Sequence, residues 1–129
     1  MVYVTIIVML ALVQFMYFGI EVGRARGRHG VSAPAVTGNE VFERFHRAHQ
    51  NTLEQLIVFI PAIYACGYYT NELLAAACGV GFLVGRAWYF RCYTTEPDTR
   101  GKGMIVTMLA SVILIIAAIV GAMQTILAS

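Results

Sequence analysis

The chain has 129 residues, of which 59% are hydrophobic and only 12% charged, and its formal net charge is +2. Soluble globular proteins carry about 25% charged residues, so this composition excludes a water-soluble enzyme, and the abundant apolar residues exclude a disordered chain. So small a net charge gives no indication of nucleic-acid binding. The three cysteines are odd in number, have no CxxC spacing and lie in apolar stretches, which predicts buried free thiols and neither a disulfide framework nor a metal site.

Four segments are long and apolar enough, or nearly so, to cross a membrane, which takes about 20 helical residues. The first lacks a preceding basic region and exceeds the apolar run of a signal peptide, about 7–15 residues, so we interpret it as a retained helix. The sequence therefore predicts an all-α integral membrane four-helix bundle. Its single domain, residues 1–129, has spans at about residues 2–23, 40–69, 72–94 and 103–127.

The positive charges predict the orientation of these spans. All nine Lys and Arg residues flank the first and third connections, and none lies at the termini or in the second connection. Loops rich in Lys and Arg stay in the cytoplasm. We therefore expect connections one and three on the cytoplasmic side and both termini on the other side.

Turn and breaker residues predict where helices start and bend. Thr37 and Glu40 have the spacing of a capping box, so the second helix is expected to begin near Gly38. Asn71 is the expected N-cap of the third helix. Pro61 lies inside the second helix, where it removes a backbone hydrogen bond and is expected to cause a kink.

The first half of the second helix carries a polar face. At 100° per residue, Glu43, Arg47, Gln50, Asn51 and Glu54 share an arc of about 100°. Such a face cannot point to lipid, so it lines the bundle interior, a subunit interface or a water-filled cavity. One interpretation is an internal network of ion pairs, Glu43 with Arg47 and Arg47 with Glu54, or a helix extension above the membrane. The other is a site for a small zwitterionic or anionic ligand.

A second polar cluster ends the third helix and follows it. Arg86, Tyr89 and Tyr93 share one helix face, and Arg100 comes shortly after. Aromatic and basic residues in this position are also typical of an interfacial belt that anchors a helix at the headgroups. Because this cluster and the polar face are expected at the same side of the membrane, together they predict a pocket at the cytoplasmic ends of the helices.

These two clusters resemble a known family. Residues 47–54, RAHQNTLE, resemble the R-A-x-x-N-x-x-E signature of the membrane-associated proteins in eicosanoid and glutathione metabolism (MAPEG). Residues 85–89, GRAWY, and 93–97, YTTEP, are similar to segments of the third type of microsomal glutathione transferase within that family. The loop that contains VSAP and FER, residues 31–44, is similar to that of the leukotriene-forming member.

The resemblance implies a homotrimer that holds glutathione, as co-substrate, between neighbouring subunits. The glutathione-binding residues that it implies, with Arg86 added from the GRAWY motif, are Arg26, Arg47, His49, Asn51, Glu54, Arg86, Tyr89 and Tyr93. Of these, Arg26 and His49 would reach in from the next subunit. Arg100 matches an arginine that polarises the thiol in the leukotriene-forming member, so Arg100 and Tyr93 are the expected catalytic residues.

This chain departs from the leukotriene-forming member at two positions. Gly27 stands where that protein has a second arginine, and Gln55 stands where it has a tyrosine after the signature Glu. The resemblance therefore does not extend to the same substrate. The segment between Pro97 and Arg100 is also one residue shorter than in the third-type subgroup, which bears on the register of Arg100.

The residue types suit the chemistry of glutathione, which has two carboxylates, an ammonium group and a thiol. Arginines can bind the carboxylates and a glutamate can accept from the ammonium. A thiol has a pKa near 8.5, and lowering it by about two units takes roughly 2.7 kcal/mol of preferential thiolate stabilisation. One arginine in a partly desolvated pocket supplies that order of free energy, a role that we assign to Arg100, with Tyr93 as a hydroxyl donor.

The sequence thus predicts a membrane-bound glutathione transferase for apolar electrophiles that arrive through the bilayer, with lipid-hydroperoxide reduction as a second activity. The alternative is a non-catalytic scaffold of the same family that binds and presents lipid. A four-helix multidrug exporter ranks last, because the first helix offers only Gln14 where such exporters use an acidic residue. We expect a bacterial inner membrane, since no targeting or retrieval signal is visible, with the glutathione site on the cytoplasmic side; an organelle membrane is the alternative.

Overall fold

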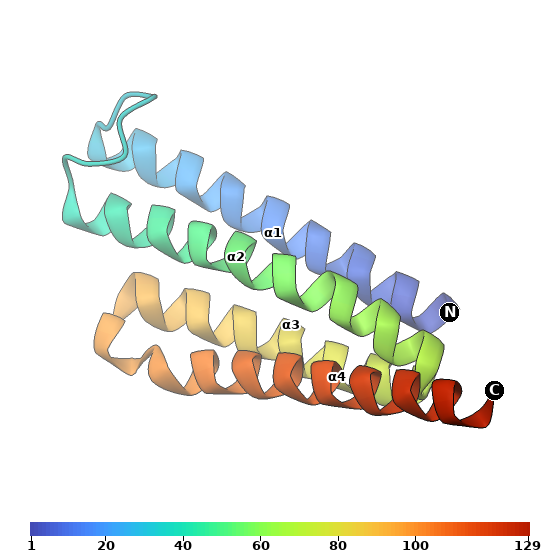
Figure 1. The fold of residues 1–129 in the computed structure, drawn as a ribbon. Coiled ribbons are helices and arrows are strands. Elements are labelled where there is room, and N and C mark those ends of the chain that lie inside the picture. Colours follow the sequence, from blue (N-terminus) through green and yellow to red (C-terminus); the bar gives the residue numbers. More distant parts are fainter.

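A computed structural model describes residues 1–129 as four long helices. They are α1 (Val2–His29), α2 (Glu40–Tyr69), α3 (Glu72–Thr95) and α4 (Gly101–Ala128), and a short 3₁₀ helix, η1 (Pro97–Thr99), separates the last two. The helices run side by side in alternating directions (Figure 1). The all-α four-helix architecture is therefore confirmed.

The two ends of the bundle differ in character. Both termini lie at one end together with the α2–α3 connection, while the α1–α2 loop and η1 lie at the other end (Figure 1). The predicted grouping of connections one and three is thus confirmed, and the Lys and Arg residues that flank them gather at one end of the bundle. We call this the cationic end.

Three of the helical segments are long and apolar enough to cross a membrane: α1, α3, and η1 together with α4. The helix α2 is more polar, because its first half carries the Glu, Arg, His, Gln and Asn side chains of residues 40–51. That α2 also spans the membrane stays a prediction. Its 30-residue length and its place alongside the other helices suit such a span.

The first helix continues beyond its apolar run. It reaches His29, six residues past the predicted end of the span near residue 23, and stops where Gly30 adopts a left-handed conformation with φ 66°. The amide of Gly30 donates to the carbonyl of Arg26 there. Arginine and alanine are good helix formers, so the polar segment stays helical through Gly23 and Gly27 and ends only at Gly30, which takes the left-handed conformation.

The start of α2 corrects one prediction. The N-cap is Asn39, whose Oδ1 accepts from the Phe42 amide at 3.0 Å, so the capping box that was expected to start at Thr37 is wrong. Gly38 has φ 124° and lies outside the helix. Asn71 caps α3 as predicted, accepting from the Leu74 amide at 2.9 Å. Pro61 lies within an uninterrupted α2.

All four helices contribute to the largest core cluster, which has 14 buried residues. At its centre the rings of Phe59 on α2 and Phe82 on α3 stack at a centroid distance of 3.8 Å. The outer faces of the bundle carry many exposed large apolar side chains, among them Val13, Met16 and Ile116. A bundle that is apolar on the outside as well as in its core is the arrangement expected in lipid. The three cysteines are free thiols; Cys66 is buried as predicted, whereas the predicted burial is wrong for Cys78 and Cys92, which are partly exposed.

Close contact between α3 and α4 holds the cationic end of these two helices together. A Cβ added to Gly103 would lie 2.5 Å from the Tyr89 amide nitrogen, and one added to Gly85 would lie 2.9 Å from the Thr107 amide nitrogen. These glycines let the two backbones approach to a distance that a side chain would prevent. They thereby fix the position of Tyr89, a predicted site residue.

Candidate functional site

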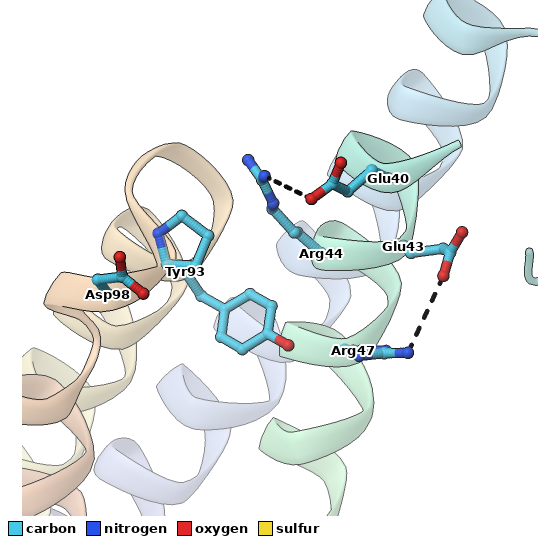
Figure 2. A pocket seen from close by; sticks show the side chains of 7 residues that line it. Glu40, Glu43, Arg44, Arg47, Tyr93 and Asp98 are labelled. Carbon is cyan, nitrogen blue, oxygen red and sulfur yellow. Dashed lines mark hydrogen bonds and ion pairs between the residues drawn. The ribbon is translucent and has the colours of Figure 1, made fainter. Parts of the chain in front are cut away.

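A cavity of about 350 Å³ opens at the cationic end, between the start of α2 and the end of α3 with η1. Figure 2 shows Tyr93 on α3 extending its hydroxyl toward α2, where Arg44 and Arg47 lie. The residues that line the cavity are Glu40, Glu43, Arg44, Arg47, Tyr93, Pro97 and Asp98. The structure thus brings together the two polar clusters that the sequence analysis placed on separate helices.

The ion pairs of this cavity are local to α2. Arg47 Nη2 lies 3.9 Å from Glu43 Oε1, and Arg44 Nη2 lies 3.2 Å from Glu40 Oε1 (Figure 2). Arg47 forms no ion pair with Glu54, so only half of the internal network that we considered is present. The side chain of Arg47 is 69% exposed, and its one acidic partner is at the limit of an ion pair. Its guanidinium group is therefore available to an anionic ligand.

Arg86 occupies the interior beside this cavity. Its side chain is completely buried, and its Nη2 donates to Asn51 Oδ1 at 2.9 Å and to Thr52 Oγ1 at 3.2 Å. The guanidinium carbon also lies 4.3 Å from the centroid of the Tyr89 ring. Arg86 thus joins the polar face of α2 to the aromatic residues of α3.

Two tyrosine side chains lie between Arg86 in the interior and Arg100 at the surface. The rings of Tyr89 and Tyr93 are 5.6 Å apart, and the guanidinium carbon of Arg100 lies 5.1 Å from the Tyr93 ring centroid. Each arginine lies near the face of a tyrosine ring, a favourable contact for a cation. The order Arg86, Tyr89, Tyr93, Arg100 confirms that these four predicted residues form one continuous cluster, which we call the arginine–tyrosine ladder.

Arg100 stands at the exposed end of this ladder. Its Nη1 donates to the Pro97 carbonyl at 2.7 Å, and no acidic side chain pairs with it. Arg100 lies between η1 and α4, one residue before the first residue of α4. Its guanidinium group is therefore held beside the Tyr93 ring by the turn, with donors left over for a ligand.

The remaining residues of the polar face differ in how deeply they are buried. Asn51 is half-buried and bonded to Arg86, whereas Glu54, nearly one helical turn further along α2, is exposed. Glu54 has no ion pair or hydrogen bond within the chain, so its carboxylate remains free to accept from a cationic group.

Two predicted site residues lie elsewhere, on the side of α2 that faces α1 and the first loop. Arg26 Nη1 donates to the Ala35 carbonyl at 2.6 Å. The ring of His49 stacks on Phe15 at 4.3 Å, and its Nε2 is buried without a hydrogen-bond partner beside Gly19. Within one chain, Arg26 and His49 therefore form no part of the cavity. That they complete the site of a neighbouring subunit stays a prediction.

Sequence reasoning missed Thr52 and Asp98. Thr52 is fully buried, and its hydroxyl donates to the Ala48 carbonyl while it accepts from Arg86. It lies half a turn away from the polar face at 100° per residue, so the angular pattern gave no signal for it. Asp98 lines the cavity from η1. Only its place directly after Pro97 could have indicated that it borders the site.

The model of the MAPEG family matches residues 3–120, so almost the whole chain is covered and the chain belongs to this family. The family resemblance that the RAHQNTLE and GRAWY segments indicated is thereby confirmed.

Several relatives match over most of the chain. An uncharacterized protein of Synechocystis is 40% identical over 114 residues, which cover 88% of this chain and 83% of that protein. Microsomal glutathione S-transferase 2 of Mus musculus is 37% identical over 113 residues, 88% of this chain and 77% of that protein. Leukotriene C4 synthase of Cavia porcellus is 36% identical over 94 residues, 73% of this chain and 63% of that protein. The likeness to third-type transferases in particular stays a prediction.

Proposed function

We propose that this protein is a membrane-bound glutathione transferase that conjugates glutathione to apolar electrophiles. The observation that carries the proposal is the cavity in which Arg47 of α2 meets Tyr93 of α3, with Arg100 beside the same tyrosine ring. Two relatives, a glutathione S-transferase and a leukotriene C4 synthase, support this class of reaction.

The site offers a partner for each group of glutathione. Arg47 is an exposed cation for a carboxylate, Glu54 is an unpaired acceptor for the ammonium group, and Asn51 adds an amide. Tyr93 lines the cavity, and Tyr89 is buried beside it. Arg26 and His49 complete the site from the next subunit of a homotrimer.

In the proposed reaction, Arg100 stabilises the thiolate of glutathione and Tyr93 donates its hydroxyl to the sulfur. The thiolate attacks an electrophilic carbon of the second substrate, a carbon–sulfur bond forms, and the leaving group departs with its electron pair. In the second activity that we propose, the thiolate attacks the terminal oxygen of a lipid hydroperoxide, and the O–O bond breaks to give a glutathione sulfenic acid and a lipid alkoxide. The alkoxide becomes an alcohol by taking up the proton that the thiol released. A second glutathione converts the sulfenic acid to glutathione disulfide and water.

The second substrate is lipophilic and reaches the site from the bilayer, because the outer helix faces are apolar. The cationic end faces the cytoplasm by the positive-inside rule. We place the protein in a bacterial inner membrane, and the relative in Synechocystis supports this placement.

The test uses the full chain purified in detergent. We expect glutathione to raise the Tm, and we expect conjugation of glutathione to chlorodinitrobenzene above the uncatalysed rate. Free cysteine, which lacks the γ-glutamyl and glycine carboxylates, is the control and should give little conjugation. Sedimentation of the detergent complex should give the mass of three chains.

An apolar groove of about 270 Å³ between α1 and α2 favours a second candidate, a scaffold that binds and presents lipid. Its lining residues are Leu12, Phe15, Leu53, Leu56, Ile57, Ile60 and Pro61. A scaffold of this kind needs no thiolate chemistry. Lipid binding without any effect of glutathione on Tm and without conjugation would favour it over the transferase.

A further inference from the structure

Arg86 is a buried cation without an acidic partner. Its side chain has no exposed surface, it forms no ion pair, and its Nε and Nη1 have no hydrogen-bond partner. Only Nη2 is bonded, to the side chains of Asn51 and Thr52. An ionised side chain inside a membrane bundle is costly and marks a functional position more often than a structural one. Direct contact with a ligand would require this buried guanidinium group to move.

The contact with Arg86 fixes the orientation of the Asn51 carboxamide. A guanidinium group only donates hydrogen bonds, so the Asn51 atom that it contacts at 2.9 Å must be the carbonyl oxygen. The amide NH₂ of Asn51 then points away from Arg86, and it has no partner within the chain. Asn51 follows Arg47 by one helical turn on the same face of α2. Its free NH₂ therefore adds a donor beside the exposed Arg47 cation.

Arg86 is itself held in place from two further sides. Thr52 Oγ1 accepts from it at 3.2 Å and donates to the Ala48 carbonyl at 2.9 Å. The Tyr89 ring covers the guanidinium group at 4.3 Å. With its nitrogens buried and its plane against a ring, Arg86 cannot follow a rotation of Asn51, so the carboxamide is preset before any ligand binds.

We propose that Arg86 is a positioning residue, which orients the Asn51 carboxamide so that its NH₂ donates to a carboxylate of the bound ligand. The unpaired buried charge of Arg86 adds to the preference for a carboxylate, because a nearby positive charge favours an anionic group at Asn51 over an ammonium group or a neutral amide. The inference rests on the proposed function in that the ligand is glutathione. It gives Arg86 a role through Asn51 in place of direct contact with glutathione.

The test is a double-mutant cycle on the full chain in detergent, with glutathione affinity as the readout. The variants are Arg86→Met, Asn51→Ala and the double variant. We expect each single change to weaken glutathione binding by about 10-fold or more, because a hydrogen bond to a charged group is lost. The double variant should bind no more weakly than Asn51→Ala, because Arg86 acts only through Asn51. Additive losses would overturn the proposal.

Asn51→Asp and Arg86→Met together distinguish a role of Arg86 in orienting Asn51 from a purely structural role in holding α2 and α3 together. The new carboxylate pairs with Arg86 and should raise the Tm of the ligand-free protein, yet it should weaken glutathione binding, because two acceptor oxygens then face a carboxylate. It should also shift preference toward a glutathione in which one carboxylate is converted to an amide. If Arg86 only held the helices together, Arg86→Met would lower the Tm of the ligand-free protein but leave glutathione affinity unchanged, and that result would overturn the proposal.

Two further variants control for folding. Arg86→Lys keeps a donor for Asn51 and should recover part of the affinity that Arg86→Met loses. Arg91→Met removes an exposed arginine from the same helix and should leave affinity unchanged. Failure of the wild-type protein to bind glutathione would refute the proposed function alone. The Tm of ligand-free Asn51→Asp would still decide the coupling of the two residues, because a fall in Tm refutes the Arg86–Asn51 contact.

Discussion

The guanidinium carbon of Arg100 lies 5.1 Å from the centroid of the Tyr93 ring, although the two residues belong to different segments on either side of η1. The turn fixes this relationship, because Arg100 also donates to the Pro97 carbonyl at 2.7 Å. The Arg100 guanidinium group is thereby held over the ring of Tyr93, a residue that lines the cavity. In the reaction that we propose, both residues act on the thiolate of glutathione.

Arg100→Ala should slow conjugation without abolishing glutathione binding. The change removes the positive charge that favours the thiolate, so the thiol pKa of bound glutathione should rise by about one to two units. Below that pKa the rate should fall by about 10- to 100-fold, and the pH–rate profile should move to higher pH. The profile is measured with chlorodinitrobenzene, and the affinity for glutathione is measured separately by Tm shift.

Arg100→Lys and Arg24→Ala are the controls for this result. Lysine keeps the charge and should preserve part of the activity, whereas Arg24 is an exposed arginine of α1, bonded to Glu21, whose loss should change nothing. A pH–rate profile of Arg100→Ala that coincides with the wild-type profile would move thiolate stabilisation to another group, with Tyr93 the next to test.

Tyr93→Phe should separate the hydroxyl of this residue from its ring. The ring keeps its place between Tyr89 and Arg100, so the fold and the Tm should stay close to wild type. If the hydroxyl donates to the sulfur, kcat should fall by about 10-fold, the cost of one hydrogen bond to a charged atom. Loss of glutathione affinity at unchanged kcat would instead assign the hydroxyl to ground-state binding.

Arg47→Ala distinguishes a ligand site from an internal ion-pair network. Its pair with Glu43 is long, at 3.9 Å, and Arg47 is 69% exposed, so the pair should contribute no more than about 1 kcal/mol to stability. We expect an almost unchanged Tm but a loss of glutathione affinity of about 10-fold or more. Arg24→Ala breaks a comparable exposed pair on α1 and should leave both quantities unchanged. A large fall in Tm at unchanged affinity would restore the network interpretation.

The sequence predicted the elements well because the apolar runs and the charge distribution act locally. Asn71 and the four helices follow from residue types and periodicity. The start of α2 does not follow from residue types, because threonine and asparagine are both suitable N-caps, so Thr37 and Asn39 were both candidates. The choice between them depends on the backbone conformation of Gly38, whose φ of 124° does not follow from the sequence.

The candidate site was only partly visible in the sequence. The polar face of α2 and the face of α3 follow from helical spacing, and the structure brings them together as expected. The depth of Arg86 does not follow from spacing, because burial depends on how α3 packs against α4, at Gly85 and Gly103, and against α2. Arg26 and His49 lie away from the cavity of their own chain, so their role in the site of a neighbouring subunit stays a prediction.

Gly103→Ala tests whether close packing of α3 and α4 positions the ladder. The added methyl group would lie 2.5 Å from the Tyr89 amide nitrogen and 2.8 Å from its Cα, and backbone cannot give way as a flexible side chain can. The helices must separate, so stability should fall by about 1–3 kcal/mol, and conjugation should fall with it because Tyr89 and Tyr93 shift. Gly23→Ala is the matched control, since nothing lies within 4 Å of a Cβ at Gly23, and it should raise stability by up to about 1 kcal/mol. Unfolding is followed by Tm in detergent, and equal effects of the two substitutions would contradict this account of the α3–α4 contact.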